Sequence, residues 1–176
     1  PGLRTGDMVH AQNPQIVKAL AGGVTSVLLI PGSGNNMSGF GSVVRTAGAT
    51  QDEVIFRAPG SLKIAQAGNP EGYWGGVGRS YMNYNLRQTL RKAKAYDQAW
   101  TAFEQGRTKV KPDVDVTWEE FRPLMQGKIP ASVHTQIYQV ALRTITMLPD
   151  EFGIKTMLDH STFDSYKACL LYTSPS

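Results

Sequence analysis

Cysteine is almost absent from this sequence, because Cys169 is the only one among 176 residues. A single cysteine excludes an internal disulfide framework and any zinc site that is built from several cysteines. Long hydrophobic runs are also missing. The best apolar run, residues 24–30, is far shorter than the roughly 20 residues that cross a bilayer. No signal peptide is visible after Pro1, so cytoplasmic, secreted and periplasmic locations all stay open.

Charge of one sign does not dominate the chain, which carries 18 basic and 14 acidic residues. The surplus lies in residues 79–128, a mostly helical segment with ten basic and six acidic residues. Such a segment could bind nucleic acid or an anionic substrate, but interleaved acidic residues favour a solvated helix face. We therefore expect a small-molecule substrate as the partner, with no nucleic acid and no membrane. A homo-oligomer stays open.

Helix and strand patterns alternate along the first two thirds of the chain. Asn13 as a cap and Pro14 in the first turn predict a helix that ends at Gly22 and Gly23. The apolar run 24–30 predicts a strand that is buried on both faces, as in a parallel sheet. Short strands are expected within 41–48 and 53–68, and a long amphipathic helix is expected over 80–104. A capping box at 117–120 then predicts a short helix that ends at Gly127.

Residues 129–162 read as a strand, a helix and a second strand. The first strand, 129–133, leads to His134, and the second, 154–158, leads to Asp159 and His160. The helix between them should be disturbed at Pro149 and stopped by Gly153. Strands that alternate with helices in this way imply an α/β fold with parallel strands and right-handed crossovers.

His134 and His160 stand at equivalent strand ends, 26 residues apart in the chain, which is about the length of one βαβ unit. Neighbouring parallel strands lie only ~4.8 Å apart, so both imidazoles can reach one ion. This pattern predicts a divalent metal, with zinc as the expected ion, that activates a water molecule for hydrolysis. The alternative is two structural histidines that hold loop carbonyls, and spacing alone leaves it open.

Three further side chains are candidates for the same region. Asp159 precedes His160 on a strand, so its side chain should point to the opposite face and make a poor co-ligand. Lys63, in a short apolar strand, could face the pore near the metal, but we expect it to extend to solvent. His10 lies in a polar stretch and is expected at the surface.

The glycine-rich loop 31–41 is the best candidate for a substrate-side loop, because its backbone can approach a ligand closely. Its candidate substrate-binding residues are Gly32, Ser33, Gly34 and Asn35. The Gly32-Ser33-Gly34 turn also allows a dinucleotide-binding domain, with Asp52 or Glu53 as the ribose acid. That fold requires a helix directly after the glycines, and the residues that follow Gly34 are not helix-forming.

A resemblance to a known family rests on four segments, GGVTSVLLIPGSGNNMSGFGSVV, LKIAQAGNP, PASVHT and LDHST. In order and spacing they resemble the metal-dependent amidohydrolase superfamily, in particular its imidazolonepropionase-related branch. The resemblance implies a (β/α)₈ TIM barrel with its site at the carboxyl ends of the strands. It also implies hydrolysis of a C–N bond in a cyclic amide, a small amide or a dipeptide, with His134 and His160 as ligands from the fifth and sixth strands.

The sequence departs from the family pattern in several places. Gln136 stands where relatives often have a second histidine, and Asp159 replaces the usual Glu. The family's first-strand His-x-His pair and its eighth-strand Asp, the expected catalytic residue, are not in this chain. Since such a barrel needs ~250 residues, we expect residues 1–168 to be an incomplete, inactive fragment. A non-catalytic barrel relative that binds a small ligand is the alternative.

The last eight residues, CLLYTSPS, break the pattern of helices and strands. They resemble a sequencing-adaptor read-through of the kind found at the ends of translated metagenomic reads. We therefore interpret 169–176 as a non-native tail, and Cys169 should have no functional role.

Overall fold

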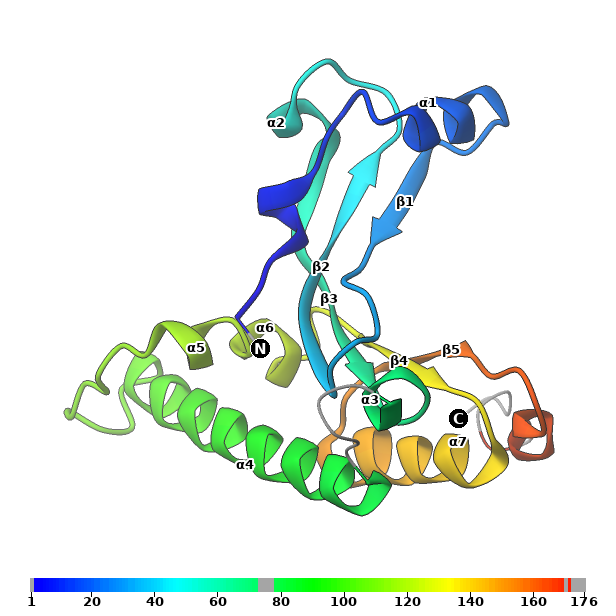
Figure 1. Ribbon diagram of the computed structural model, residues 1–176. Helices are drawn as coiled ribbons and strands as arrows, with labels where there is room; N and C mark the ends of the chain where they lie inside the picture. Colours follow the sequence, from blue (N-terminus) through cyan, green and yellow to red (C-terminus); the bar gives the residue numbers. More distant parts are fainter. Residues whose placement is uncertain (1, 73–77, 170, 172–176) are drawn as a thin grey trace.

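A mixed five-stranded sheet, in the order β1-β2-β3-β4-β5, runs through the computed structural model, which describes residues 2–72, 78–169 and 171 (Figure 1). β1 and β2 pair antiparallel, as do β2 and β3, whereas β3, β4 and β5 are parallel. The sheet is curled like half of a barrel. The strands are β1 (Ser26–Leu29), β2 (Met37–Arg45), β3 (Ile55–Ala65), β4 (Ala131–Thr135) and β5 (Thr156–His160).

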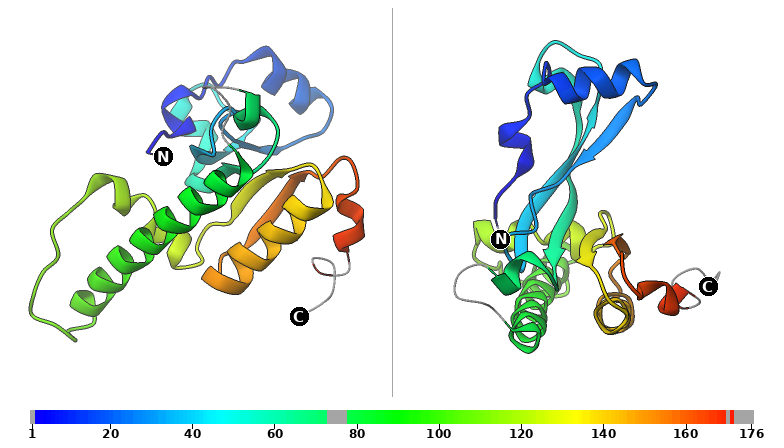
Figure 2. Two further views of the ribbon diagram at one scale, coloured as in Figure 1. Left: turned by 60° about the horizontal axis from the view of Figure 1, so that its bottom comes forward. Right: turned by 45° about the vertical axis from the view of Figure 1, so that its right-hand side comes forward.

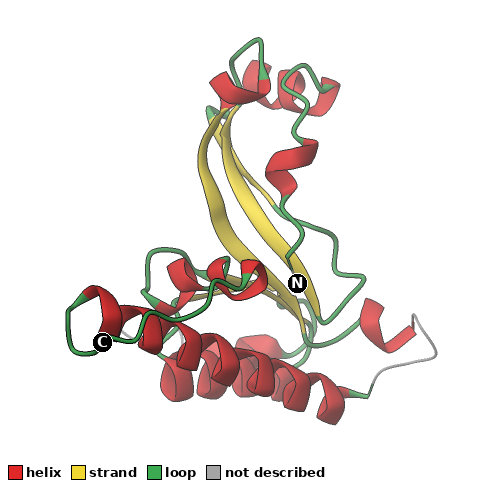
Figure 3. Cartoon of the chain, turned by 90° about the vertical axis from the view of Figure 1, so that its left-hand side faces the viewer, coloured by secondary structure: helices red, strands yellow, loops and turns green. Residues whose placement is uncertain are grey.

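The helices lie mainly at one end of the sheet. α4 (Arg79–Glu104) and α7 (Tyr138–Ile145) lie side by side there, and a π-helical turn, η2 (Thr146–Glu151), continues α7 (Figure 2). The far ends of β1–β3 project from this base as an arm that carries helices at its tip (Figure 3). The remaining elements are η1 (Thr5–Met8), α1 (Pro14–Ala21), α2 (Gln51–Val54), α3 (Asn69–Gly72), α5 (Val116–Glu119), α6 (Arg122–Met125) and η3 (Ser165–Ala168).

The main core lies between the parallel part of the sheet and the helices, and Leu86, Leu90 and Ala93 of α4 belong to it. Burial of these side chains from both layers is what holds the helices against the sheet. Its fully or nearly fully buried members are Phe40, Leu62, Ile64, Leu86, Leu90, Ala93, Phe121, Leu124, Ile129, Ala131, Val133, Met147, Leu148 and Ile154.

Local signals for helix ends were confirmed in part. The Asn13 side chain accepts a hydrogen bond from the Gln15 N–H, with Pro14 in the first turn of α1, as predicted. The predicted capping box at 117–120 was wrong, because Asp115 caps α5 and accepts from the N–H groups of Thr117 and Trp118. A carboxylate at Asp115 reaches the free N–H groups of the first turn, so the helix begins before Thr117.

The predicted parallel arrangement of all strands was wrong for the first half of the chain. The run 24–30 contains β1, which is an antiparallel edge strand whose residues are exposed or half-buried. β2 and β3 follow it with no long helix between them, so only β3, β4 and β5 form the predicted strand–helix–strand pattern. The fold is thus mixed α/β, and its curled sheet is consistent with a partial barrel.

The predicted boundary between residues 168 and 169 stays a prediction. Residues 170 and 172–176 of the proposed tail lie outside the described residues. Over the described ranges, no helix combines the length and the apolar character that a membrane span requires.

Candidate functional site

The two predicted histidines meet at the carboxyl end of the β4–β5 pair. Their ring centroids lie 4.2 Å apart. The strand register, however, pairs His134 with Asp159 and Thr135 with His160. Regular alternation of side chains would therefore place His160 on the face opposite to His134.

A reversal of the backbone brings His160 back to the side of His134. His160 has a φ of 67° and Ser161 a φ of 48°, a left-handed conformation that non-glycine residues rarely adopt. The Ser161 N–H donates to the Thr135 carbonyl at 2.9 Å, and the two hydroxyl groups lie 2.9 Å apart. Such strain costs about 1–3 kcal/mol per residue and is concentrated at functional sites, so the role of His160 as a site residue stays a prediction that this turn motivates.

The His134 side chain is buried, and its two ring nitrogens differ in their hydrogen bonding. Its Nδ1 lies 2.9 Å from the Ser33 hydroxyl oxygen, and its side chain is buried. Its Nε2 is buried as well and has no hydrogen-bond partner in the described part of the chain. Burial, followed by the positive charges of His160 and Lys63, lowers the pKa of His134. The imidazole is therefore held neutral, which is the form that binds metals.

The loop that carries Ser33 is fixed to the sheet by Asn36. The Asn36 side chain donates to the Ala65 carbonyl at 2.9 Å, its own carbonyl accepts from the Ala65 N–H at 2.9 Å, and Asn85 donates to its side-chain oxygen at 3.0 Å. Sequence reasoning missed Asn36, although an asparagine at a loop end is a usual hydrogen-bonding residue. The result is that Ser33 lies beside His134.

Of the four predicted substrate-binding residues, Ser33 is the one whose side chain hydrogen-bonds to His134 within the described ranges. Gly32 and Asn35 are exposed and Gly34 is half-buried. Their part in substrate binding stays a prediction.

Lys63 and Asp159 form a buried pair next to the histidines. Lys63 Nζ lies 2.5 Å from Asp159 Oδ2, and the Lys63 side chain is only 1% exposed, so the prediction that it extends to solvent was wrong. The prediction that Asp159 turns away from the site was also wrong. The register places Asp159 beside His134, and it is His160 that departs from regular alternation. His10 is exposed, as predicted.

Burial raises the pKa of the Asp159 carboxyl, but the hydrogen bond and charge of Lys63 outweigh it and hold the pKa below its usual value. Asp159 is therefore ionised and neutralises Lys63. Within the described ranges, no group of three or more His, Cys, Asp or Glu side chains is placed to hold a metal ion. His134 and His160 can thus supply only part of a ligand set.

The dinucleotide alternative is contradicted by the fold. The residues after Gly34 enter β2 at Met37 instead of a helix. Glu53 accepts hydrogen bonds from the backbone N–H groups of Ala49 and Thr50 at the start of α2, so its carboxylate has a capping role.

Gly68 offers a test of how tightly His134 is enclosed. Gly68 has a φ of +80°, and a Cβ atom there would lie 3.1 Å from His134 Nε2. Gly68→Ala should lower the free energy of unfolding by about 1–2 kcal/mol, because alanine is strained in the left-handed conformation that glycine adopts freely. The added Cβ should also displace the His134 imidazole. Chemical denaturation and the NMR signals of the His134 ring would measure both effects.

The matched control is Gly72→Ala, because a Cβ at Gly72 meets no atom of the described residues within 4 Å. Unchanged His134 signals in Gly68→Ala, or equal changes in both variants, would contradict the close enclosure of the ring.

Comparison with solved structures found a similarity to an amidohydrolase from Thermotoga maritima MSB8, with a TM-score of 0.81 and 30% sequence identity. The match covers 92% of this chain and 43% of that one, so this chain spans less than half the length of the solved structure. No protein-family model and no curated protein matched the sequence. The similarity supports the amidohydrolase superfamily, and it does not support the imidazolonepropionase-related branch.

Proposed function

We propose that this chain is part of a metal-dependent amidohydrolase in which His134 and His160 bind a divalent cation, with zinc as the expected ion. The observation that carries the proposal is that the imidazole ring centroids of His134 and His160 lie 4.2 Å apart at the ends of β4 and β5. The likeness to a solved amidohydrolase supports the class of reaction.

The chemistry of the two donors fits such an ion. Neutral imidazole is a usual zinc ligand, and burial, aided by the nearby His160 and Lys63, lowers the pKa of His134 and so favours its neutral form. The left-handed backbone at His160 is a conformation that is retained only where the surrounding structure requires it. Catalytic zinc sites use three protein ligands, so at least one more would lie outside the described residues.

The bound cation would lower the pKa of a water molecule and polarise the carbonyl of the substrate. The chain's own residues would prepare that site. Ser33 holds the His134 ring through Nδ1, and Asn36 holds the loop of Ser33 against β3. Lys63 and Asp159 add a paired charge on the same side of the sheet, so they bring little net charge.

The substrate we propose is a compound with a hydrolysable C–N bond, such as a cyclic amide, a small amide or a dipeptide. The loop residues Gly32, Ser33, Gly34 and Asn35 would contact it, because Ser33 already lies beside His134. A relation to imidazolonepropionases, which act on a cyclic amide, would be one case of this class.

Titration of the metal-free chain with Co²⁺, followed by absorption spectroscopy and calorimetry, tests the metal site. We expect weak, saturable binding that falls by about 100-fold or more in His134→Asn and in His160→Asn, since even the outer partners of metal ligands contribute 10–100-fold. Asparagine tolerates the left-handed backbone at position 160, so this variant separates ligation from strain.

The control is His10→Asn, which changes an exposed histidine far from the pair in sequence. Equal affinities in the wild type and in the His134 and His160 variants would overturn the metal assignment. A full-length protein that binds metal and small amides but shows no amide hydrolysis would favour the non-catalytic relative.

A further inference from the structure

A second candidate site lies between α4 and α7, on the other face of the sheet. A polar pocket of about 240 Å³ is lined there by Gln66, Arg79, Asn83, Gln139, Val140 and Arg143. Gln66 follows Ala65, whose partner in the register is His134. Because side chains alternate along a strand, Gln66 points away from the histidines, so this pocket is separate from the proposed metal site.

The floor of the pocket is a buried hydrogen-bond network that joins three elements. Gln66, at the end of β3, is only 2% exposed and donates through Nε2 to Asn83 Oδ1 on α4 at 2.9 Å. The buried Thr144 hydroxyl of α7 hydrogen-bonds to Gln66 Oε1. This network uses one N–H of the Gln66 amide, and within the described residues it uses neither N–H of Asn83. The floor therefore presents hydrogen-bond donors.

The walls of the pocket are two arginines. Arg79 uses its Nε and Nη2 to bind Glu71, at 2.7 and 3.3 Å, and a guanidinium has five N–H groups, so further donors remain. Arg143 is exposed, and none of its side-chain N–H groups has a hydrogen-bond or ion-pair partner in the part of the chain that the structure describes. Since Glu71 neutralises Arg79, Arg143 leaves the pocket with a net positive charge.

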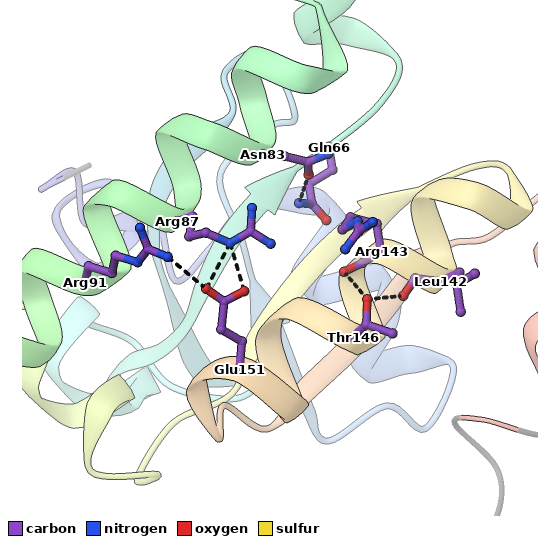
Figure 4. Close-up of polar contacts among 8 residues, drawn as sticks. All are labelled: Gln66, Asn83, Arg87, Arg91, Leu142, Arg143, Thr146 and Glu151. Carbon is purple, nitrogen blue, oxygen red and sulfur yellow. Dashed lines mark hydrogen bonds and ion pairs between the residues drawn. The ribbon is translucent and has the colours of Figure 1, made fainter.

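A second pair of arginines on α4, Arg87 and Arg91, binds a carboxylate that the chain itself supplies. Further along α4, Arg87 and Arg91 both bind Glu151 of η2, at 2.8 and 3.6 Å (Figure 4). In the same view Arg143 lies beside the Gln66–Asn83 pair. Arg143 thus has the donors of an anion site, and within the described residues no carboxylate forms an ion pair with it.

We propose that the pocket between α4 and α7 binds a small oxyanion, such as the carboxylate or phosphate group of a small molecule. Arg143 and Arg79 would hold the oxyanion from the two walls through charge-assisted hydrogen bonds, and the amide groups of Asn83 and Gln66 would donate from below. The pocket volume suits a group of a few heavy atoms.

Calorimetric titration of the chain with sodium phosphate and, separately, with sodium acetate tests the proposal. We expect saturable binding of at least one of the two anions, weakened by added sodium chloride, and the comparison identifies which kind of oxyanion is preferred. Arg143→Gln should lower the affinity about tenfold or more, because it removes charge-assisted hydrogen bonds. Arg79→Gln should lower it as well.

The matched control is Arg107→Gln, which removes the same charge from an exposed arginine beyond the other end of α4. NMR titration should move the side-chain amide signals of Asn83 in the wild type and not in Arg143→Gln. The His134→Asn variant should bind the anion like the wild type, so failure of the metal site would not affect this result.

The proposal is overturned if neither anion shows saturable binding, or if Arg107→Gln weakens binding as much as Arg143→Gln does. Circular dichroism of each variant confirms that the exposed substitutions leave the fold intact.

Discussion

Asp159→Asn is expected to lower the free energy of unfolding by about 3 kcal/mol. Lys63 is 1% exposed, and its ammonium lies 2.5 Å from Asp159 Oδ2. Within the described residues, no other carboxylate forms an ion pair with Lys63. Removal of the anion leaves a buried cation without a counter-charge, and the protein must then either keep that charge or deprotonate it.

Lys63→Met should cost much less, about 1 kcal/mol, because the Asp159 side chain is 34% exposed and water can solvate it once its partner is gone. In the Lys63→Met background, Asp159→Asn should have almost no further effect. Urea denaturation of the four proteins in this cycle measures the coupling between the two residues. Additive losses would show that the pair is not coupled in the folded chain.

The same pair should make the protein sensitive to acid. Burial raises the pKa of Asp159, but the hydrogen bond and charge of Lys63 hold it below its usual value. A carboxyl with a lowered pKa in the folded state stabilises the protein above the unfolded value of ~3.9, and that stability is lost as the pH falls through the folded pKa. Asp159→Asn should not show this loss.

Phe121→Ala is expected to lower the free energy of unfolding by about 3–5 kcal/mol, because it removes a large ring from a filled core. Phe121 is 0% exposed and lies between α5 and α6. Its ring meets Phe40 of β2 edge-on at 5.3 Å and lies 5.7 Å from Trp118. The ring therefore joins the base of the arm to the helical layer.

Phe163→Ala is the matched control, since Phe163 is 69% exposed and should change the free energy of unfolding by less than about 0.5 kcal/mol. Thermal and chemical denaturation of both variants provide the comparison. Similar losses in the two variants would show that Phe121 does not hold the arm to the helices.

Local features of this protein were determined by its sequence. Asn13 and Pro14 specified the start of α1, and the spacing of Met82, Leu86 and Leu90 specified the buried face of α4. Signals of this kind act within a few residues, so the sequence is enough to read them. The length of one strand–helix–strand unit predicted that His134 and His160 lie near each other, but the predicted matching register was wrong by one residue, because His134 pairs with Asp159.

Tertiary structure decided which strands pair, in which direction, and what the buried polar groups meet. The apolar run in β1 suits a central parallel strand, yet contact with β2 made it an antiparallel edge. Lys63 is buried because Asp159, 96 residues later, supplies its counter-charge, and no local pattern shows that partner. His160 faces His134 only through a left-handed turn, a conformation held by the hydrogen bonds of Ser161 to Thr135 on the neighbouring strand.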